Sequence, residues 1–299
     1  MTPLVQDLVT LRDWLRYAVS RFGEAKLAFG HGLTNAYDEA AYLLLHALHL
    51  PLDRLEPFLD ARLTQSERAQ LAQLLERRID QRVPAAYLTR EAWLGPFRFY
   101  VDERVLIPRS FIAELLPEGL APYVGPAESV TAALDLCTGS GCLAVLLAHA
   151  YPNADVDAVD IATDALTVAQ RNVAEYALAD RINLIRSDLF SNLSGKSYDL
   201  IISNPPYVTA LAMENLPPEY RHEPAIALAG GDDGLEAVRT ILKEAPRFLN
   251  PDGTLVVEVG DNRVAAELAF PRVPFVWLET ATASDSVFLL KREDLVTRR

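Results

Sequence analysis

The sequence predicts an α/β protein with a mostly parallel β-sheet covered by helices, preceded by a small helical domain and a β-hairpin linker. From about residue 129 onward, apolar strand patterns alternate with amphipathic helical patterns, which is typical of a parallel sheet wrapped by helices. Up to residue 84, apolar residues recur at helical spacing. Between these regions, aromatic and β-branched residues surround a Gly95-Pro96 turn.

The predicted helical domain spans residues 1–84. Thr64 followed by Glu67 forms a capping-box pattern, which predicts a helix beginning just after Thr64. Apolar residues spaced by three and four predict buried helix faces in three segments: Leu8, Leu11, Leu15 and Val19; Ala40, Leu43, Leu44 and Ala47; and Leu71, Leu74, Leu75 and Ile79.

The linker, residues 85–108, is predicted to form a β-hairpin around Gly95-Pro96. The third region, residues 109–299, is the sheet domain. Its last two strands are joined by a short polar turn, too brief for a parallel crossover, so at least one of them should run antiparallel. Strands are predicted at residues 129–136, 155–160, 182–187, 198–203, 253–260, 274–280 and 286–291.

The composition limits the classes of partner. There are 28 Lys and Arg against 41 Asp and Glu, a net charge of −13. Nucleic-acid binding depends on basic residues that displace counterions, so this balance favours a small molecule or a basic protein as the partner. The start of the chain lacks a signal-peptide pattern, no apolar run is long enough to span a bilayer, and only two cysteines occur. We expect a cytoplasmic protein without a membrane segment.

A glycine-containing turn follows the first predicted strand of the sheet domain. In "ALDLCTGSGCL", Gly139 and Gly141 would let the backbone approach a ligand closely. The turn lacks both the third glycine of a dinucleotide site and the Lys-Ser/Thr pair of a phosphate loop. A pyrophosphate ligand is therefore not well served.

Two aspartates end the next two predicted strands. Asp160 is placed to accept hydrogen bonds from ribose hydroxyls, and Asp188 to accept one from an adenine amino group beside an apolar wall at Leu189. Either aspartate alone is better explained as a helix cap or turn residue. Together, at the carboxyl edge where ligands bind open α/β sheets, they predict an adenosine-type ligand.

The fourth strand ends in Asn204-Pro205-Pro206-Tyr207. An amide or exocyclic amine is a weak nucleophile that needs orientation more than a strong base. The Asn204 side-chain oxygen and the Pro205 carbonyl can accept its two N–H groups, Pro206 stiffens the loop, and Tyr207 can stack on a flat substrate group. Without the glycine turn, the segment would be only a loop signal.

Other candidates are weaker. Cys137 and Cys142 flank the glycine turn, but no histidine is nearby in sequence, and buried cysteines are usually small hydrophobic residues. His46 and His49 lack a third ligand in register, so we predict no metal site.

The motifs "DLCTGSG", Asp160, "SDLF" and "NPPY", in this order, resemble the S-adenosylmethionine-dependent methyltransferases, and specifically the HemK-like protein glutamine methyltransferases. The resemblance covers essentially the whole chain. It implies a Rossmann-like class I methyltransferase sheet, S-adenosyl-L-methionine as cofactor, and an N-terminal domain that helps to hold the protein substrate. The implied catalytic residues are Asn204, Pro205, Pro206 and Tyr207, and the implied cofactor-binding residues are Asp135, Thr138, Gly139, Gly141, Asp160, Ile161, Asp188, Leu189 and Asn204.

Within this family, one branch modifies release factors and another modifies the third protein of the large ribosomal subunit. The chain resembles the second branch at "IPRSFIAE" and "YRHEPAIALA", and departs from it at Phe111, where that branch leads us to expect proline. The implied substrate is a glutamine of that basic ribosomal protein, met before assembly and without direct nucleic-acid contact. The alternatives are a release-factor methyltransferase, a nucleic-acid adenine methyltransferase and a non-catalytic assembly factor.

Overall fold

The computed structural model describes residues 6–116, 118 and 120–296. The chain divides into two compact units: residues 1–92 with 216–222, and residues 93–215 with 223–299. The division falls inside the first strand of the hairpin, and a short segment from the later part of the chain belongs to the first unit. We call these the helical unit and the sheet unit.

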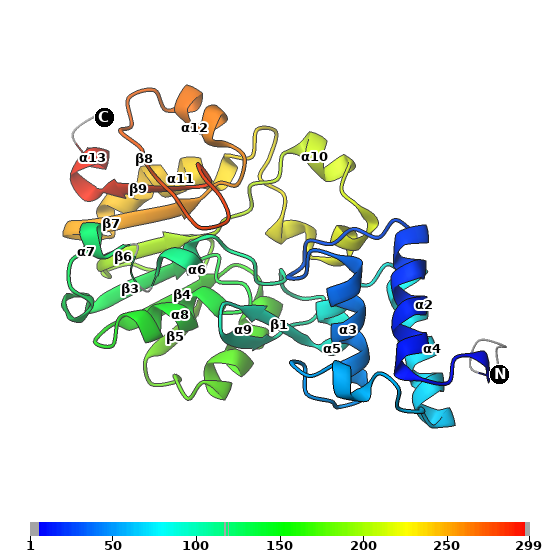
Figure 1. Ribbon diagram of the computed structural model, residues 1–299. Coiled ribbons are helices and arrows are strands. Elements are labelled where there is room, and N and C mark those ends of the chain that lie inside the picture. Colours follow the sequence, from blue (N-terminus) through cyan, green and yellow to red (C-terminus); the bar gives the residue numbers. More distant parts are fainter. Residues whose placement is uncertain (1–5, 117, 119, 297–299) are drawn as a thin grey trace. The chain divides into compact units, whose positions relative to one another are not determined.

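The helical unit is built from amphipathic helices around one apolar core (Figure 1). Thr64 accepts a hydrogen bond from the Glu67 backbone while Glu67 accepts one from the Thr64 backbone, which confirms the predicted capping box. Trp14 and Phe22 are fully buried among the predicted leucines. The helices are α2 (Leu11–Glu24), α3 (Ala36–Ala47), η1 (Glu56–Phe58), α4 (Gln65–Ile79), α5 (Ala85–Thr89) and η3 (Pro218–His222).

The segment Leu216–His222 is held in the helical unit by a buried ion pair. Arg78, 1% exposed, donates to Glu39 at 2.6 Å and to Glu219 at 3.4 Å, and its third hydrogen bond goes to the Ala28 carbonyl. Arg82 also donates to Glu219, at 3.2 Å. A buried guanidinium is tolerated only when its donors are paired in this way.

The predicted hairpin forms around the Gly95-Pro96 turn, where Gly95 has a φ of 58°. Its strands are β1 (Glu91–Leu94) and β2 (Phe97–Tyr100). Residues 85–89, which we placed in the hairpin linker, form the short helix α5 instead. Ala85 and Ala86 favour a helix after Pro84, and Arg90 ends it in the left-handed region with a φ of 58°.

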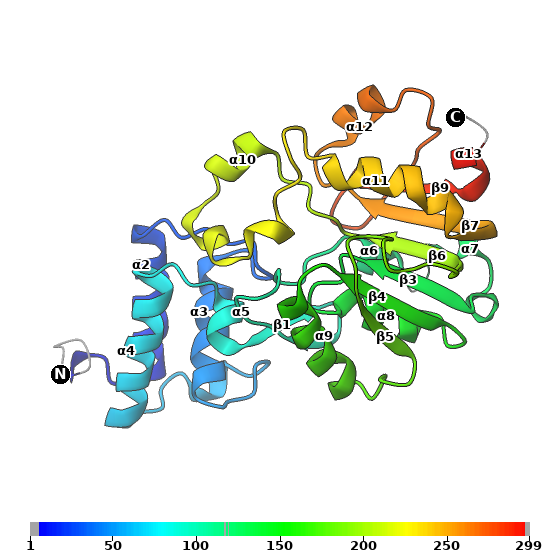
Figure 2. The same ribbon diagram turned by 180° about the vertical axis from the view of Figure 1, so that it is seen from behind.

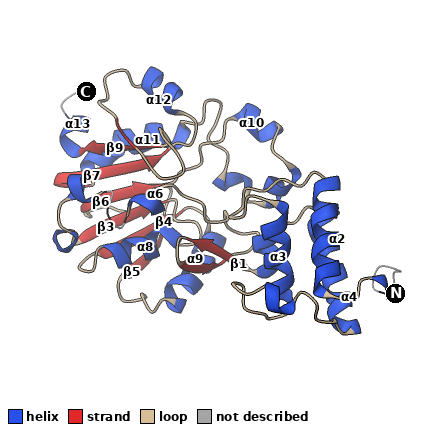
Figure 3. Ribbon diagram, viewed as in Figure 1, coloured by secondary structure: helices blue, strands red, loops and turns tan. Residues whose placement is uncertain are grey.

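The sheet unit contains seven strands among its described residues, in the order β5-β4-β3-β6-β7-β9-β8 (Figure 3). β3 to β7 are mutually parallel, whereas β9 is antiparallel to both of its neighbours. This confirms the mostly parallel sheet with an antiparallel terminal strand. The strands are β3 (Ala132–Leu136), β4 (Asp155–Asp160), β5 (Ile182–Arg186), β6 (Tyr198–Ser203), β7 (Leu249–Glu258), β8 (Val276–Leu278) and β9 (Val287–Lys291).

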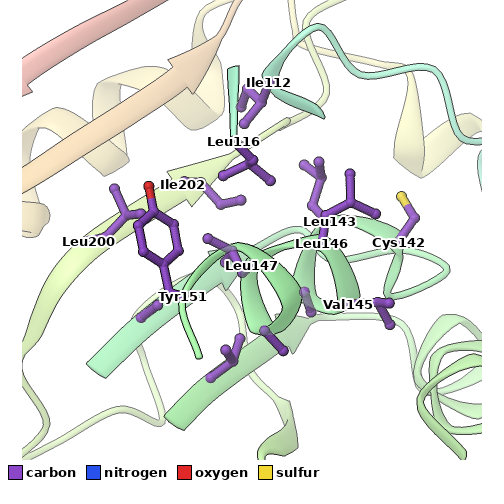
Figure 4. Close-up of a cluster of buried hydrophobic side chains, with 14 of the residues drawn as sticks. Ile112, Leu116, Cys142, Leu143, Val145, Leu146, Leu147, Tyr151, Leu200 and Ile202 are labelled. Carbon is purple, nitrogen blue, oxygen red and sulfur yellow. The ribbon is translucent and has the colours of Figure 1, made fainter. Parts of the chain in front are cut away.

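Helices cover both faces of this sheet (Figures 1 and 2). Alternate strand residues enter opposite cores because successive side chains point to opposite faces: Leu200 and Ile202 pack with α8, while Ile201 packs with α11. Figure 4 shows the first of these cores. The helices are α6 (Ile112–Leu115), α7 (Ala121–Val124), η2 (Ala127–Ser129), α8 (Cys142–Ala150), α9 (Thr163–Glu175), α10 (Ala210–Glu214), η4 (Ala225–Ala227), α11 (Glu236–Glu244), η5 (Ala245–Arg247), α12 (Arg263–Ala269) and α13 (Arg292–Val296).

Within the described residues, no helix combines the length and apolar character that crossing a bilayer requires. The same part of the chain contains no group of three or more His, Cys, Asp or Glu side chains placed to hold a metal ion.

Candidate active site

A cavity of about 400 Å³ lies in the sheet unit, at the carboxyl ends of β3, β4, β5 and β6. This is the edge at which open α/β sheets bind ligands. Its walls come from six parts of the chain: residues 104–110, 137–143, 159–165, 187–189, 204–206 and 224–240.

The glycine turn forms one wall. A Cβ added at Gly139 would meet no atom within 4 Å, so this position leaves open space beside the backbone. A Cβ at Gly141 would lie 3.1 Å from that of Ala169 on α9, and Gly141 therefore lets the turn pack closely on that helix. Both glycines have positive φ, 55° and 78°, which side chains other than glycine rarely adopt.

Asp160, the last residue of β4, faces this turn. Its two carboxylate oxygens accept hydrogen bonds from the backbone N–H groups of Gly139 and Ala162, both at 2.9 Å. Burial raises the pKa of Asp160, and these two bonds only partly offset that effect. Each oxygen retains a lone pair, so the carboxylate can accept two further hydrogen bonds from a ligand.

Asp135 lies directly below the turn and is fully buried. Its Oδ2 accepts from Thr138 Oγ1 at 2.6 Å, while its Oδ1 has no partner among the described residues. Burial, with a smaller contribution from the Asp160 charge, raises the pKa of Asp135 to about 7. An unpartnered buried oxygen of this kind calls for a donor, such as an ammonium group or a water molecule.

Asp188 and Leu189 follow β5 and line the cavity together with Ile161. The Ile161 side chain is 44% exposed, which is unusual for an isoleucine at the end of a buried strand. The three side chains give one end of the cavity a carboxylate between two apolar surfaces, which suits a flat heteroaromatic ring with an amino group.

Asn204 and Pro206 line the cavity from the end of β6. Among the described residues, the Asn204 side-chain amide has no hydrogen-bond partner. The structure therefore brings eight of the sequence-predicted residues to one cavity: Thr138, Gly139, Asp160, Ile161, Asp188, Leu189, Asn204 and Pro206. Asp135, Gly141, Pro205 and Tyr207 lie behind this lining.

Tyr207 points away from the cavity wall. Its hydroxyl donates to Glu258 Oε1 at 3.2 Å, and its backbone carbonyl accepts from Asn262 Nδ2 at 2.7 Å. A Cβ added at Gly260 would lie 2.6 Å from the Tyr207 ring, so only glycine fits there. The ring is thus packed inside the protein, which differs from the expected stacking on a flat substrate group.

Sequence reasoning missed the residues that hold the linker segment against the cavity. Arg109 makes a two-pronged ion pair with Glu223, at 2.6 and 2.7 Å, and the Ile107 backbone N–H donates to the same carboxylate at 3.0 Å. An "EP" dipeptide beside a buried arginine gives no local signal, because its partner lies 114 residues away.

The two cysteines are buried beside the turn, and burial raises the pKa of Cys142 to about 12 and that of Cys137 further. Both thiols stay protonated, which agrees with their interpretation as small hydrophobic residues.

The donor set fits an adenosyl sulfonium cofactor. Carboxylates end two adjacent strands, the Gly139 backbone leaves a space that a Cβ would fill, and the cavity contains no cluster of Lys or Arg of the kind a pyrophosphate needs.

Comparison with known proteins agrees with this site. The family model described as "Methyltransferase small domain" matches residues 120–216, and the one described as "PrmC N-terminal domain" matches residues 13–89. The crystal structure of the hMettl16 catalytic domain in complex with an RNA hairpin has a TM-score of 0.50 and 16% identity, over 75% of this chain and 80% of that one. The fold is that of a class I methyltransferase.

Closer relatives extend over nearly the whole chain. A protein of Neisseria meningitidis serogroup B is 59% identical over 97% of this chain and 96% of its own length. A protein of Bordetella pertussis is 59% identical over 98% of both chains, and one of Bradyrhizobium diazoefficiens is 50% identical over 97% and 92%. All three are named ribosomal protein uL3 glutamine methyltransferase. The chain belongs to this family.

Proposed function

We propose that this protein transfers the methyl group of S-adenosyl-L-methionine to the side-chain amide nitrogen of a glutamine in ribosomal protein uL3. The observation that supports the substrate is the identity of 50–59% to uL3 glutamine methyltransferases over almost the full length of each chain. The site agrees with the chemistry, because an unpartnered Asn204 amide faces a cavity suited to the cofactor.

The cofactor would be held by the residues at the carboxyl edge. We assign Asp160 to the ribose hydroxyls, Asp188 to the adenine amino group, and Ile161 and Leu189 to the faces of the adenine ring. Thr138, Gly139 and Gly141 shape the turn, and Asp135 supports it from below. When bound, S-adenosyl-L-methionine supplies an electrophilic methyl group on a sulfonium.

The protein's own contribution is to orient a poor nucleophile. The Asn204 side-chain oxygen and the Pro205 carbonyl would accept the two N–H groups of the glutamine amide, which turns the nitrogen lone pair toward the methyl group. The nitrogen forms a bond to carbon, the carbon–sulfur bond breaks, and the nitrogen releases one proton toward solvent. Pro206 limits the movement of the loop, since its ring fixes φ.

Charge supports the choice of partner. The net charge of −13 would attract a basic ribosomal protein free in solution, and would be repelled by the phosphates of ribosomal RNA after assembly. We therefore propose that the enzyme acts in the cytoplasm on uL3 that is not yet assembled, without direct contact to nucleic acid.

A labelled-methyl assay tests this function. The enzyme is incubated with labelled cofactor and, in parallel, with isolated uL3, assembled large subunits, a release factor or DNA. We expect label in isolated uL3 and much less in assembled subunits. Label in the release factor alone or in DNA alone would replace the proposed substrate, and binding of uL3 without any transfer would favour a non-catalytic assembly factor.

A further inference from the structure

Glu258, the last residue of β7, is a fully buried carboxylate that the proposed chemistry does not use. Three donors surround it. Ser110 Oγ donates to Oε2 at 2.6 Å, the Phe111 backbone N–H donates to the same oxygen at 2.9 Å, and the Tyr207 hydroxyl donates to Oε1 at 3.2 Å.

No salt bridge involving Glu258 forms among the described residues, so hydrogen bonds alone compensate its burial. Hydrogen bonds are directional and ion pairs are less so, which means that the carboxylate fixes the positions of its donors closely. These donors come from two segments that border the cavity. Ser110 lines it directly, and Tyr207 ends the segment that contains Asn204.

We propose that Glu258 is a positioning residue for methyl transfer, which holds Tyr207 and Ser110 and thereby sets the place of Asn204 at the cavity. This inference rests on the proposed function. Glu258 touches neither substrate nor cofactor and acts only through the residues it holds.

The surroundings of Tyr207 support this role. Residues of one short segment, 258–262, fix three parts of the tyrosine: Glu258 its hydroxyl, Gly260 its ring and Asn262 its carbonyl. On the other side, Cβ atoms added at Gly230 and Gly234 would lie 2.7 Å from the Tyr207 Cα and 2.4 Å from its carbonyl oxygen. The tyrosine therefore has little room to move, and Asn204, three residues before it, is placed with it.

The same sheet offers a matched control. Tyr198, the first residue of β6, donates its hydroxyl to Asp157 Oδ2 at 2.7 Å and is 2% exposed. This pair has the same chemistry as Tyr207 with Glu258 but lies at the opposite end of the strand. Neither residue of this pair lines the cavity.

The experiment compares Tyr207→Phe with Tyr198→Phe, since each change removes one hydroxyl from a buried tyrosine. We expect Tyr207→Phe to lower kcat for uL3 methylation by about tenfold or more, because small displacements of an orienting group are costly. Cofactor affinity, measured by calorimetry, should not change. Tyr198→Phe should lower the melting temperature by a similar amount and leave kcat unchanged.

Glu258→Gln and Glu258→Ala complete the test. Glutamine keeps an acceptor for Phe111 and a polar partner for Tyr207, so it should retain more of kcat than alanine does. The inference is overturned if wild-type enzyme methylates uL3 while Tyr207→Phe retains full kcat, and this result does not depend on whether Glu258→Ala folds. Absence of transfer by the wild-type enzyme would instead reject the proposed function, and the inference with it.

Discussion

The two ends of the parallel strands treat their polar side chains differently. Near the amino end, Asp199 of β6 accepts hydrogen bonds from Thr131 N, Thr131 Oγ1, Ala132 N and Asn250 Nδ2, at 2.6 to 3.1 Å. Partial burial would raise the pKa of Asp199, but these bonds outweigh it and lower the pKa. At the carboxyl end, burial raises the pKa of Asp160, Asp135 and Glu258.

Asp157 of β4 extends the contrast. Lys196, Tyr198 and Asn183 all donate to it, and its two oxygens are fully used. In contrast, Asp135 Oδ1 and the Asn204 amide have no partner among the described residues. Polar groups that already have partners stabilise the fold, whereas those left without partners lower its stability and are available to a ligand.

The largest expected effect is that of Asn204→Ala. If the Asn204 oxygen orients the glutamine amide, its loss should lower kcat by roughly a hundredfold or more, the scale found when one preorganised polar group is removed from an active site. Melting temperature and cofactor affinity should change little, because the Asn204 amide makes no hydrogen bond to other described residues.

The matched control for this change is Asn183→Ala. Asn183 donates to Asp157 at 2.9 Å, away from the cavity, so its removal should affect stability and leave kcat unchanged. Wild-type turnover by Asn204→Ala would require the amide-orienting mechanism to be abandoned. A charge variant, Asn204→Asp, keeps an acceptor but places a negative charge near the sulfonium, so it should bind cofactor at least as tightly and still turn over slowly.

The second prediction concerns Asp160→Ala. Charge-assisted hydrogen bonds contribute about 1.5–3 kcal/mol each, so losing one ribose contact should weaken cofactor binding about tenfold to a hundredfold. Calorimetric titration measures this directly. Asp199→Ala serves as the control, with lower stability and the same cofactor affinity. If both variants bound cofactor as the wild type does, Asp160 would be only a turn residue.

The third prediction is a pH effect of opposite sign at the two edges. Burial raises the pKa of Glu258 from 4.5 to about 7. Between these values, the folded protein keeps a proton that the unfolded chain releases, so rising pH favours unfolding. Relative to Glu258→Gln, the wild type should lose up to about 1.4 kcal/mol of unfolding free energy per pH unit in this window.

Asp199 should show the reverse. Its folded pKa lies below the ordinary 3.8, so the wild type should gain stability over Asp199→Asn as pH rises past this range. Urea unfolding of both pairs at several pH values gives the two differences, and the other titrating groups cancel within each pair. Parallel curves for wild type and Glu258→Gln would show that Glu258 is ionised throughout.

Local patterns were enough to predict most of the sheet. The runs at 155–160 and 198–203 were predicted with the bounds of β4 and β6, since an apolar run that ends in Asp160 or in Asn204-Pro205 marks where a buried strand stops. The short polar turn before β9 was enough to predict an antiparallel strand. These features depend on neighbouring residues, which the sequence displays directly.

Contacts between distant residues could not be predicted in this way. Tyr207 and Glu258 are 51 residues apart, and Arg78 and Glu219 are 141 apart. Nothing local to Glu219 shows that Leu216–His222 joins the helical unit, and nothing local to Tyr207 shows that its ring is enclosed by glycines. The residues that face the cavity were predictable, whereas those that hold them in place were not.

Tandem mass spectrometry of uL3 after reaction with the enzyme is the most direct test of the central claim, that the carboxyl edge orients a glutamine amide for methylation. We predict one added methyl group on the side-chain nitrogen of one glutamine with the wild-type enzyme, and little or none after the same time with Asn204→Ala. A methyl group on any other side chain, or equal modification by both enzymes, would contradict the account.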